Sequence, residues 1–223
     1  MDEKQLSAVN LVQQGHNLFL TGCPGTRKTF TLSKIVERLQ VCGKNVCLTG
    51  STGKAASVLK ENIPDLDTTV TTNHRFCGLL DGRYPNEQLL VLLQENDFFR
   101  PKNKILNADV VIIYEISMIS CKTFNQIEYI FRMLRQKKQP FGGIQMILAG
   151  RDLTQLPPVP NLEYNDDGSL FVTSTLMDNF HVIRLHTVQR QEEVDYIQAI
   201  HDVARLVIKL ICKCVCVFLL VEI

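Results

Sequence analysis

The sequence has almost no net charge and no segment with the clear features of a membrane span. Its 223 residues carry 24 basic and 23 acidic side chains, a formal charge of +1. Because the chain creates no strong overall field, any site for a polyanion must be local. The N-terminus lacks the basic, apolar and small-residue order of a signal peptide. The apolar run 206–223 borders on the length of a membrane span, but it is short and is interrupted by Lys209 and Lys213, so it does not by itself predict membrane association.

The sequence also lacks C-x-x-C spacings among its 8 cysteines, internal repeats and low-complexity stretches. Without such spacings the cysteines give no motif for a metal or redox centre. We expect reduced thiols in an intracellular protein. A chain of this length forms one large domain or one domain with appendages. The composition changes abruptly after Arg205, which marks 206–223 as an appendage.

Short apolar runs alternate with helix-like stretches along the chain. Strands are predicted at 16–21, 45–49, 108–115, 144–149 and 181–185, of which 16–21, 108–115 and 144–149 have the apolar runs of buried strands. Amphipathic patterns, such as that of 123–138, predict helices between or beside them. Because parallel strands need crossover connections, this alternation predicts an α/β domain whose parallel sheet is flanked by helices.

The segment 22–29, Gly-Cys-Pro-Gly-Thr-Arg-Lys-Thr, joins the first predicted strand to a helix. In such a connection successive N–H groups converge at the helix start, the helix dipole adds positive potential, and a lysine reaches outer phosphates. The segment therefore predicts a loop for a triphosphate, although alone it also fits an ordinary strand-turn-helix connection. The candidate nucleotide-binding residues in it are Gly22, Gly25, Thr26, Lys28 and Thr29.

Two further side chains stand out by position. Glu115 ends the predicted strand 108–115, and the carboxyl end of a central parallel strand is where such sheets face a ligand. His74 lies in the poorly periodic stretch 63–101. With no partner His or Cys in view, we favour a packed or solvated histidine over a metal ligand.

Together these stretches resemble the petite integration frequency (Pif) family of DNA helicases, a branch of superfamily one related to the RecD helicases. The resemblance covers residues 1–205 and implies the first RecA-like domain of the family, a P-loop NTPase fold, with 206–223 as an unrelated apolar tail. The strings that carry it occur in the family's order: Gln5, Phe19–Gly22 with its loop, Thr49–Ala56, Thr72–Phe76, Ile113–Met118, Pro140–Gln145, Gln155–Val159 and Arg190-Gln191.

The resemblance implies ATP and Mg²⁺ as cofactors. Gln5 would recognise the adenine, Lys28 would hold the outer phosphates and Thr29 would ligate Mg²⁺. Glu115 would orient or deprotonate the attacking water. Two other catalytic roles are implied, a sensor of the terminal phosphate at Gln155 and an arginine finger at Arg190.

The resemblance further implies single-stranded or forked DNA as partner, a role in genome maintenance (repair, recombination and telomere maintenance), and a place in the nucleus or mitochondrion. DNA would cross the loops after the second strand and around 74–76, where the ring of Phe76 would stack on a base. The DNA-contact residues so implied are Ser51, Thr52, Lys54, His74 and Phe76.

Three positions depart from the family pattern. Arg27 replaces the glycine before the lysine, Tyr114 replaces an aspartate that normally holds the magnesium shell, and Arg151 separates Gly150 from Asp152. A phenol supplies no charge at neutral pH. Arg27 is bulky where glycine lets the backbone approach phosphate, although its guanidinium could contact phosphate oxygens instead.

Two hypotheses follow. In the first, the chain is an ATP-dependent DNA helicase domain by descent, truncated and weakened in hydrolysis. In the second, it is a catalytically inactive nucleotide- or DNA-binding remnant. ATP turnover in the presence of single-stranded DNA separates them.

Overall fold

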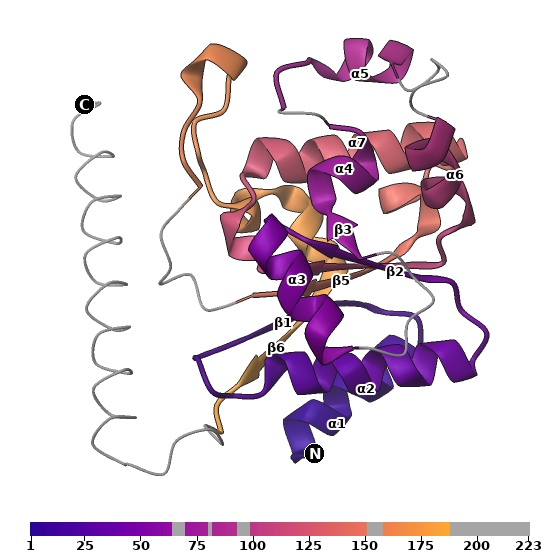
Figure 1. The fold of residues 1–223 in the computed structure, drawn as a ribbon, viewed down its shortest axis with the longest axis vertical. Coiled ribbons are helices and arrows are strands. Elements are labelled where there is room, and N and C mark those ends of the chain that lie inside the picture. Colours follow the sequence, from indigo (N-terminus) through magenta and orange to yellow (C-terminus); the bar gives the residue numbers. More distant parts are fainter. Residues whose placement is uncertain (64–69, 80–81, 93–98, 151–157, 188–223) are drawn as a thin grey trace.

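A parallel sheet lies at the centre of the computed structural model (Figure 1). The described residues are 1–63, 70–79, 82–92, 99–150 and 158–187. Within them six strands pair in the order β3-β2-β4-β5-β1-β6, and every pairing is parallel. The strands are β1 (Asn17–Gly22), β2 (Val46–Gly50), β3 (Thr71–Thr72), β4 (Val110–Tyr114), β5 (Gln145–Ala149) and β6 (Phe180–Leu185). The predicted α/β fold with a parallel sheet is confirmed.

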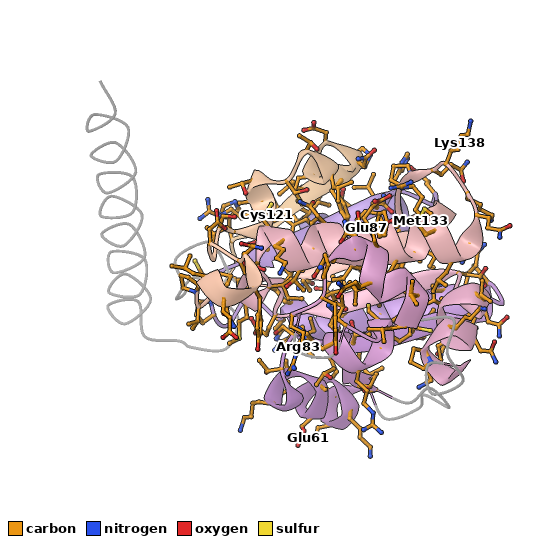
Figure 2. The ribbon with its side chains drawn as sticks, turned by 90° about the horizontal axis from the view of Figure 1, so that it is seen from above. Glu61, Arg83, Glu87, Cys121, Met133 and Lys138 are labelled. Carbon is orange, nitrogen blue, oxygen red and sulfur yellow. The ribbon has the colours of Figure 1, made fainter. Side chains whose placement is uncertain are left out.

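Helices cover both faces of the sheet, as Figure 1 shows. One side carries α1 (Glu3–Gln13), α2 (Lys28–Val41) and α3 (Gly53–Asn62). The other carries α4 (Asn73–Cys77), α6 (Phe99–Asn107) and α7 (Cys121–Arg135), with α5 (Asn86–Leu92) packed against α7. Seen from above in Figure 2, α7 crosses the sheet with Cys121 near one end and Met133 near the other.

The central strands β1, β2, β4 and β5 are buried on both faces because their side chains alternate between the two helical layers, whereas the edge strands β3 and β6 are partly exposed. In β1, Leu18 and Leu20 pack in the core cluster under α1 and α2, whereas Phe19 packs in the cluster under α7. In β4, Val111 and Ile113 likewise join the α7 side. Burial on both faces explains why these strands read as continuous apolar runs rather than as alternating patterns.

Phe124 of α7 anchors the helical layer on that side. Its ring lies 5.6 Å from the ring of Phe141, 5.8 Å from that of Phe171 and 6.2 Å from that of Phe180. The Ser120 side chain accepts a hydrogen bond from the N–H of Thr123 and begins the helix two residues earlier than the pattern predicts. Gln136 ends it, because its φ of +54° is left-handed, so the predicted extension to residue 138 is wrong.

Five cysteines of the described part are free: Cys23, Cys42, Cys47, Cys77 and Cys121. Burial raises the pKa of the Cys47 thiol to about 11 and also raises that of the fully buried Cys77 thiol. Both thiols therefore stay protonated and unreactive at neutral pH. No helix in the described ranges is long and apolar enough to cross a membrane, and the predicted tail 206–223 lies outside those ranges.

Candidate nucleotide-binding site

The loop between β1 and α2 begins at a glycine that no other residue could replace without strain. Gly22 has a φ of +149°, and a Cβ on it would lie 2.5 Å from the carbonyl oxygen of Leu185 in β6. At the other side of the turn, Thr26 is 1% exposed and its hydroxyl donates to the carbonyl of Cys23 at 2.9 Å. The loop is therefore held in shape by β6 and by its own hydrogen bonds.

The backbone of this loop has the conformation of an anion-binding concavity. Gly25 and Arg27 have positive φ values, +85° and +56°, while Thr26 between them does not. Such alternation turns successive N–H groups toward one point. The start of α2 also has no side-chain cap, whereas Thr52 caps α3 and Ser120 caps α7. Arg27 thus offers no side-chain acceptor to the first turn of α2, which suits a helix start that receives phosphate.

Lys28, the first residue of α2, is hydrogen-bonded to the backbone of the loop. Its side chain is buried, and Nζ donates to the carbonyl oxygens of Gly22 at 2.7 Å and Cys23 at 3.0 Å. Both acceptors belong to the loop itself. The ammonium group is therefore positioned at the loop, where a lysine can exchange carbonyl oxygens for phosphate oxygens.

Of the six buried side-chain N and O atoms without a hydrogen-bond partner in the described part of the chain, three belong to residues at the carboxyl ends of strands. They are Oγ1 of Thr21 in β1, Oγ of Ser51 after β2 and Oε2 of Glu115 after β4. Leaving a buried polar atom unpaired costs about 1–3 kcal/mol, so each one calls for an explanation. Because parallel strands end at one edge, these three residues lie at the same edge of the sheet as the loop, where a bound polar ligand can serve as a partner for such atoms.

Tyr114 occupies the position at which the resemblance implies a metal-holding carboxylate. It is the last residue of β4 and pairs in register with Gly50 and Ala149. Its side chain is 8% exposed, and its hydroxyl lies 3.2 Å from Oγ1 of Thr29, with either oxygen able to donate. The implied magnesium ligand is thus hydrogen-bonded to a neutral phenol.

The residues present do not fit the implied magnesium site. Mg²⁺ is usually bound through carboxylates at 2.0–2.1 Å in near-ideal octahedral geometry. Here Thr29 and Tyr114 offer two neutral hydroxyl groups that already bond each other. In the described ranges, no group of three or more His, Cys, Asp or Glu side chains could hold a metal ion.

Gln5 plays a structural role that the sequence did not reveal. Its side chain is 1% exposed and completes a capping box at the start of α1, where Oε1 accepts from the N–H of Asp2 at 3.0 Å. Nε2 of Gln5 is buried and has no partner among the described residues. The donor end of the amide is therefore the end without a partner and is available for a base.

The implied DNA-contact residues fall into two groups around α3 and α4. Thr52 caps α3 by accepting from the N–H of Ala55 at 3.2 Å, Ser51 precedes it, and Lys54 is exposed in the first turn. His74 of α4 is half-buried and lines a cavity of about 220 Å³.

Phe76 is buried and cannot be one of the DNA-contact residues. It is 3% exposed, and its ring packs edge-on against that of Phe131 in α7, with centroids 6.1 Å apart. A ring buried in the core cannot stack on a base. Gln155 and Arg190, the other implied catalytic residues, and Arg151 lie outside the described residues.

Arg27 carries backbone strain, and this gives a stability prediction. A non-glycine residue in the left-handed region costs about 1–2 kcal/mol, which glycine avoids at a smaller cost in unfolded-state entropy. We expect Arg27→Gly to raise the free energy of unfolding by about 0.5–1 kcal/mol, measured by urea denaturation. Lys34→Gly, in the interior of α2, should instead lower it by about 1 kcal/mol. A loss of stability in Arg27→Gly would contradict the strain assignment.

The fold and site together define a P-loop NTPase with a RecA-like core. Comparison with known sequences then identifies the family: the model of the PIF1-like helicases matches residues 2–214, and the chain belongs to that family. The chain is 34% identical over 191 residues to the ATP-dependent DNA helicase Pif1 of Psychrobacter sp. (strain PRwf-1). That match covers 85% of this chain and 27% of the relative, so the chain spans about a quarter of the relative's length.

Solved structures show the same likeness. The Pif1 helicase of Candida albicans superposes with a TM-score of 0.75 at 31% identity, covering 89% of this chain and 42% of that one. The Pif1 helicase of Bacteroides, solved in complex with ADP-AlF3 and ssDNA, has a TM-score of 0.73 at 27% identity. That match covers 92% of this chain and 46% of the Bacteroides chain.

Proposed function

We propose that this chain binds ATP in the Gly22–Thr29 loop and single-stranded or forked DNA beside it, as the first RecA-like domain of an ATP-dependent DNA helicase. The observation that carries the proposal is the loop itself, with its alternating backbone and with Lys28 bonded to Gly22 and Cys23. Membership of the PIF1-like helicases supports it. So does the Bacteroides structure, whose ligands are a nucleotide complex and ssDNA.

In this proposal the loop N–H groups and Lys28 hold the phosphates, because phosphoryl transfer depends on charge neutralisation and positioning. Glu115 orients the attacking water, and its unpaired Oε2 is the acceptor available for that task. Gln5 donates to the adenine through Nε2. We assign the phosphate sensor to Gln155 and the arginine finger to Arg190.

For DNA we keep Ser51, Thr52, Lys54 and His74, which lie after β2 and on α4. With a formal charge of +1, binding must come from such local contacts rather than from a general field. We propose that the domain spans 1–205 and serves DNA repair, recombination or telomere maintenance in the nucleus or mitochondrion.

One observation favours a second candidate, a nucleotide- and DNA-binding module without turnover. The Tyr114 hydroxyl bonds the Thr29 hydroxyl, so the metal that normally aids phosphoryl transfer has no carboxylate at this position to bind. We therefore propose that any hydrolysis by this chain is weak.

ATP turnover with and without a single-stranded oligonucleotide tests the proposal. Weak phosphate release that rises with DNA and disappears in Glu115→Gln supports a hydrolysing helicase domain. Saturable binding of ATP and DNA without release supports the binding module. A purified, folded chain that binds neither ATP nor DNA would overturn both.

A further inference from the structure

We infer that the site binds a nucleoside triphosphate without a divalent cation, and that the Arg27 guanidinium supplies positive charge that a bound metal would otherwise bring. The inference rests on the proposed nucleotide binding and adds the charge requirement of the same site. It follows from two side chains: Tyr114, whose hydroxyl bonds that of Thr29, and Arg27, which lies two residues before Thr29 in the loop.

The first step concerns the place of the metal. Tyr114 is 8% exposed, and its ring packs with the core cluster under α2 and α3. Packing fixes the ring, so its hydroxyl stays 3.2 Å from Oγ1 of Thr29. A cation bound to Thr29 at 2.0–2.1 Å would have to displace that hydroxyl and would gain no carboxylate from position 114 in return.

The second step concerns charge. A triphosphate carries several negative charges, and bringing them to a partly buried site without cations is unfavourable. Lys28 provides one positive charge at the loop. In the absence of a metal a second cation near the phosphates would lower the cost further.

Arg27 is the second cation of the loop. It precedes Lys28 directly, its positive φ of +56° makes it part of the phosphate-binding concavity, and its side chain is exposed. The Thr31 hydroxyl donates to the Arg27 carbonyl at 3.1 Å, but in the described ranges no hydrogen bond or ion pair involves the Arg27 guanidinium. The guanidinium therefore breaks no such contact when it turns to a phosphate. A guanidinium presents five donors in a planar fork that matches phosphate oxygens.

Binding of a fluorescent ATP derivative, measured in excess EDTA and in excess Mg²⁺, tests the inference. The parent chain should bind with dissociation constants that differ by less than about threefold between the two conditions. Arg27→Gln keeps a long, non-glycine side chain but removes the charge, and should weaken binding in EDTA by about tenfold. Tyr114→Asp should make Mg²⁺ strengthen binding by about tenfold or more.

Arg38→Ala is the matched control, because it removes a like charge from the far, exposed end of the same helix and should leave both constants unchanged. Thermal melts confirm that each variant is folded. Parent binding that requires Mg²⁺, or Arg27→Gln binding equal to the parent in EDTA, would overturn the inference and leave the proposed nucleotide site standing. Absence of saturable binding in both conditions would instead overturn the proposed function itself.

Discussion

Replacing Lys28 by alanine is expected to weaken ATP binding by about a hundredfold, because charge-assisted hydrogen bonds to phosphate are worth about 1.5–3 kcal/mol each. The Lys28 ammonium already sits at the loop, bonded to the carbonyls of Gly22 and Cys23. The Lys28 side chain therefore loses little conformational entropy when it binds a phosphate. Isothermal titration of the parent and variant chains with ATP measures the difference.

Lys34→Ala is the control for this experiment. Lys34 lies on the same helix, but its side chain is 42% exposed and pairs with Glu37 at 2.7 Å. Such a surface pair contributes little, so the control should bind ATP as the parent does. Because Lys28 also ties the loop, a thermal melt must show that Lys28→Ala is folded. Equal affinity in folded Lys28→Ala and parent chains would contradict the phosphate role of Lys28.

Restoring both altered positions, Arg27→Gly with Tyr114→Asp, is expected to raise ATP hydrolysis in Mg²⁺ by about a hundredfold, the scale at which one electrostatic group acts on a transition state. The aspartate would face the Thr29 hydroxyl in place of the phenol, which lies 3.2 Å from it here. Glycine at 27 would adopt a φ of +56° without strain. Steady-state phosphate release measures the gain.

The gain should depend on Glu115. The same pair of changes combined with Glu115→Gln keeps the restored groups but removes the carboxylate proposed to orient water, and should return hydrolysis to the parent level. EDTA should do the same. A doubly restored chain that binds ATP and Mg²⁺ but hydrolyses no faster than the parent would show that Tyr114 and Arg27 are not what limits turnover.

The sequence predicted the central strands β1, β2, β4 and β5 because they are buried on both faces. The continuous apolar run of β4 needs no tertiary information to be recognised, and its parallel pairing follows from the crossover lengths. The short edge strand β3 was missed, since Thr71 and Thr72 form no apolar run and pair only with the end of β2.

The part of the site that lies within one continuous segment could be predicted from the sequence. The loop 22–29 shows its strand-turn-helix layout locally. The contact of Tyr114 with Thr29 joins residues 85 positions apart and depends on how β4 and α2 are placed. Phe76 was misjudged for a similar reason: in a stretch of poor periodicity, the side of α4 that faces α7 could not be read from the pattern.

The backbone amide spectrum of the isotope-labelled chain, recorded as ATP is added in EDTA, tests the central claim most directly. Binding at the proposed site predicts that the amide signals of Gly22, Gly25, Lys28 and Thr29 move first and furthest, accompanied by that of Glu115. Signals on the outer surface of α7, on the other side of the sheet, should stay in place. ATP-dependent changes that spare the loop, or no change at saturating ATP in a folded chain, would contradict the account.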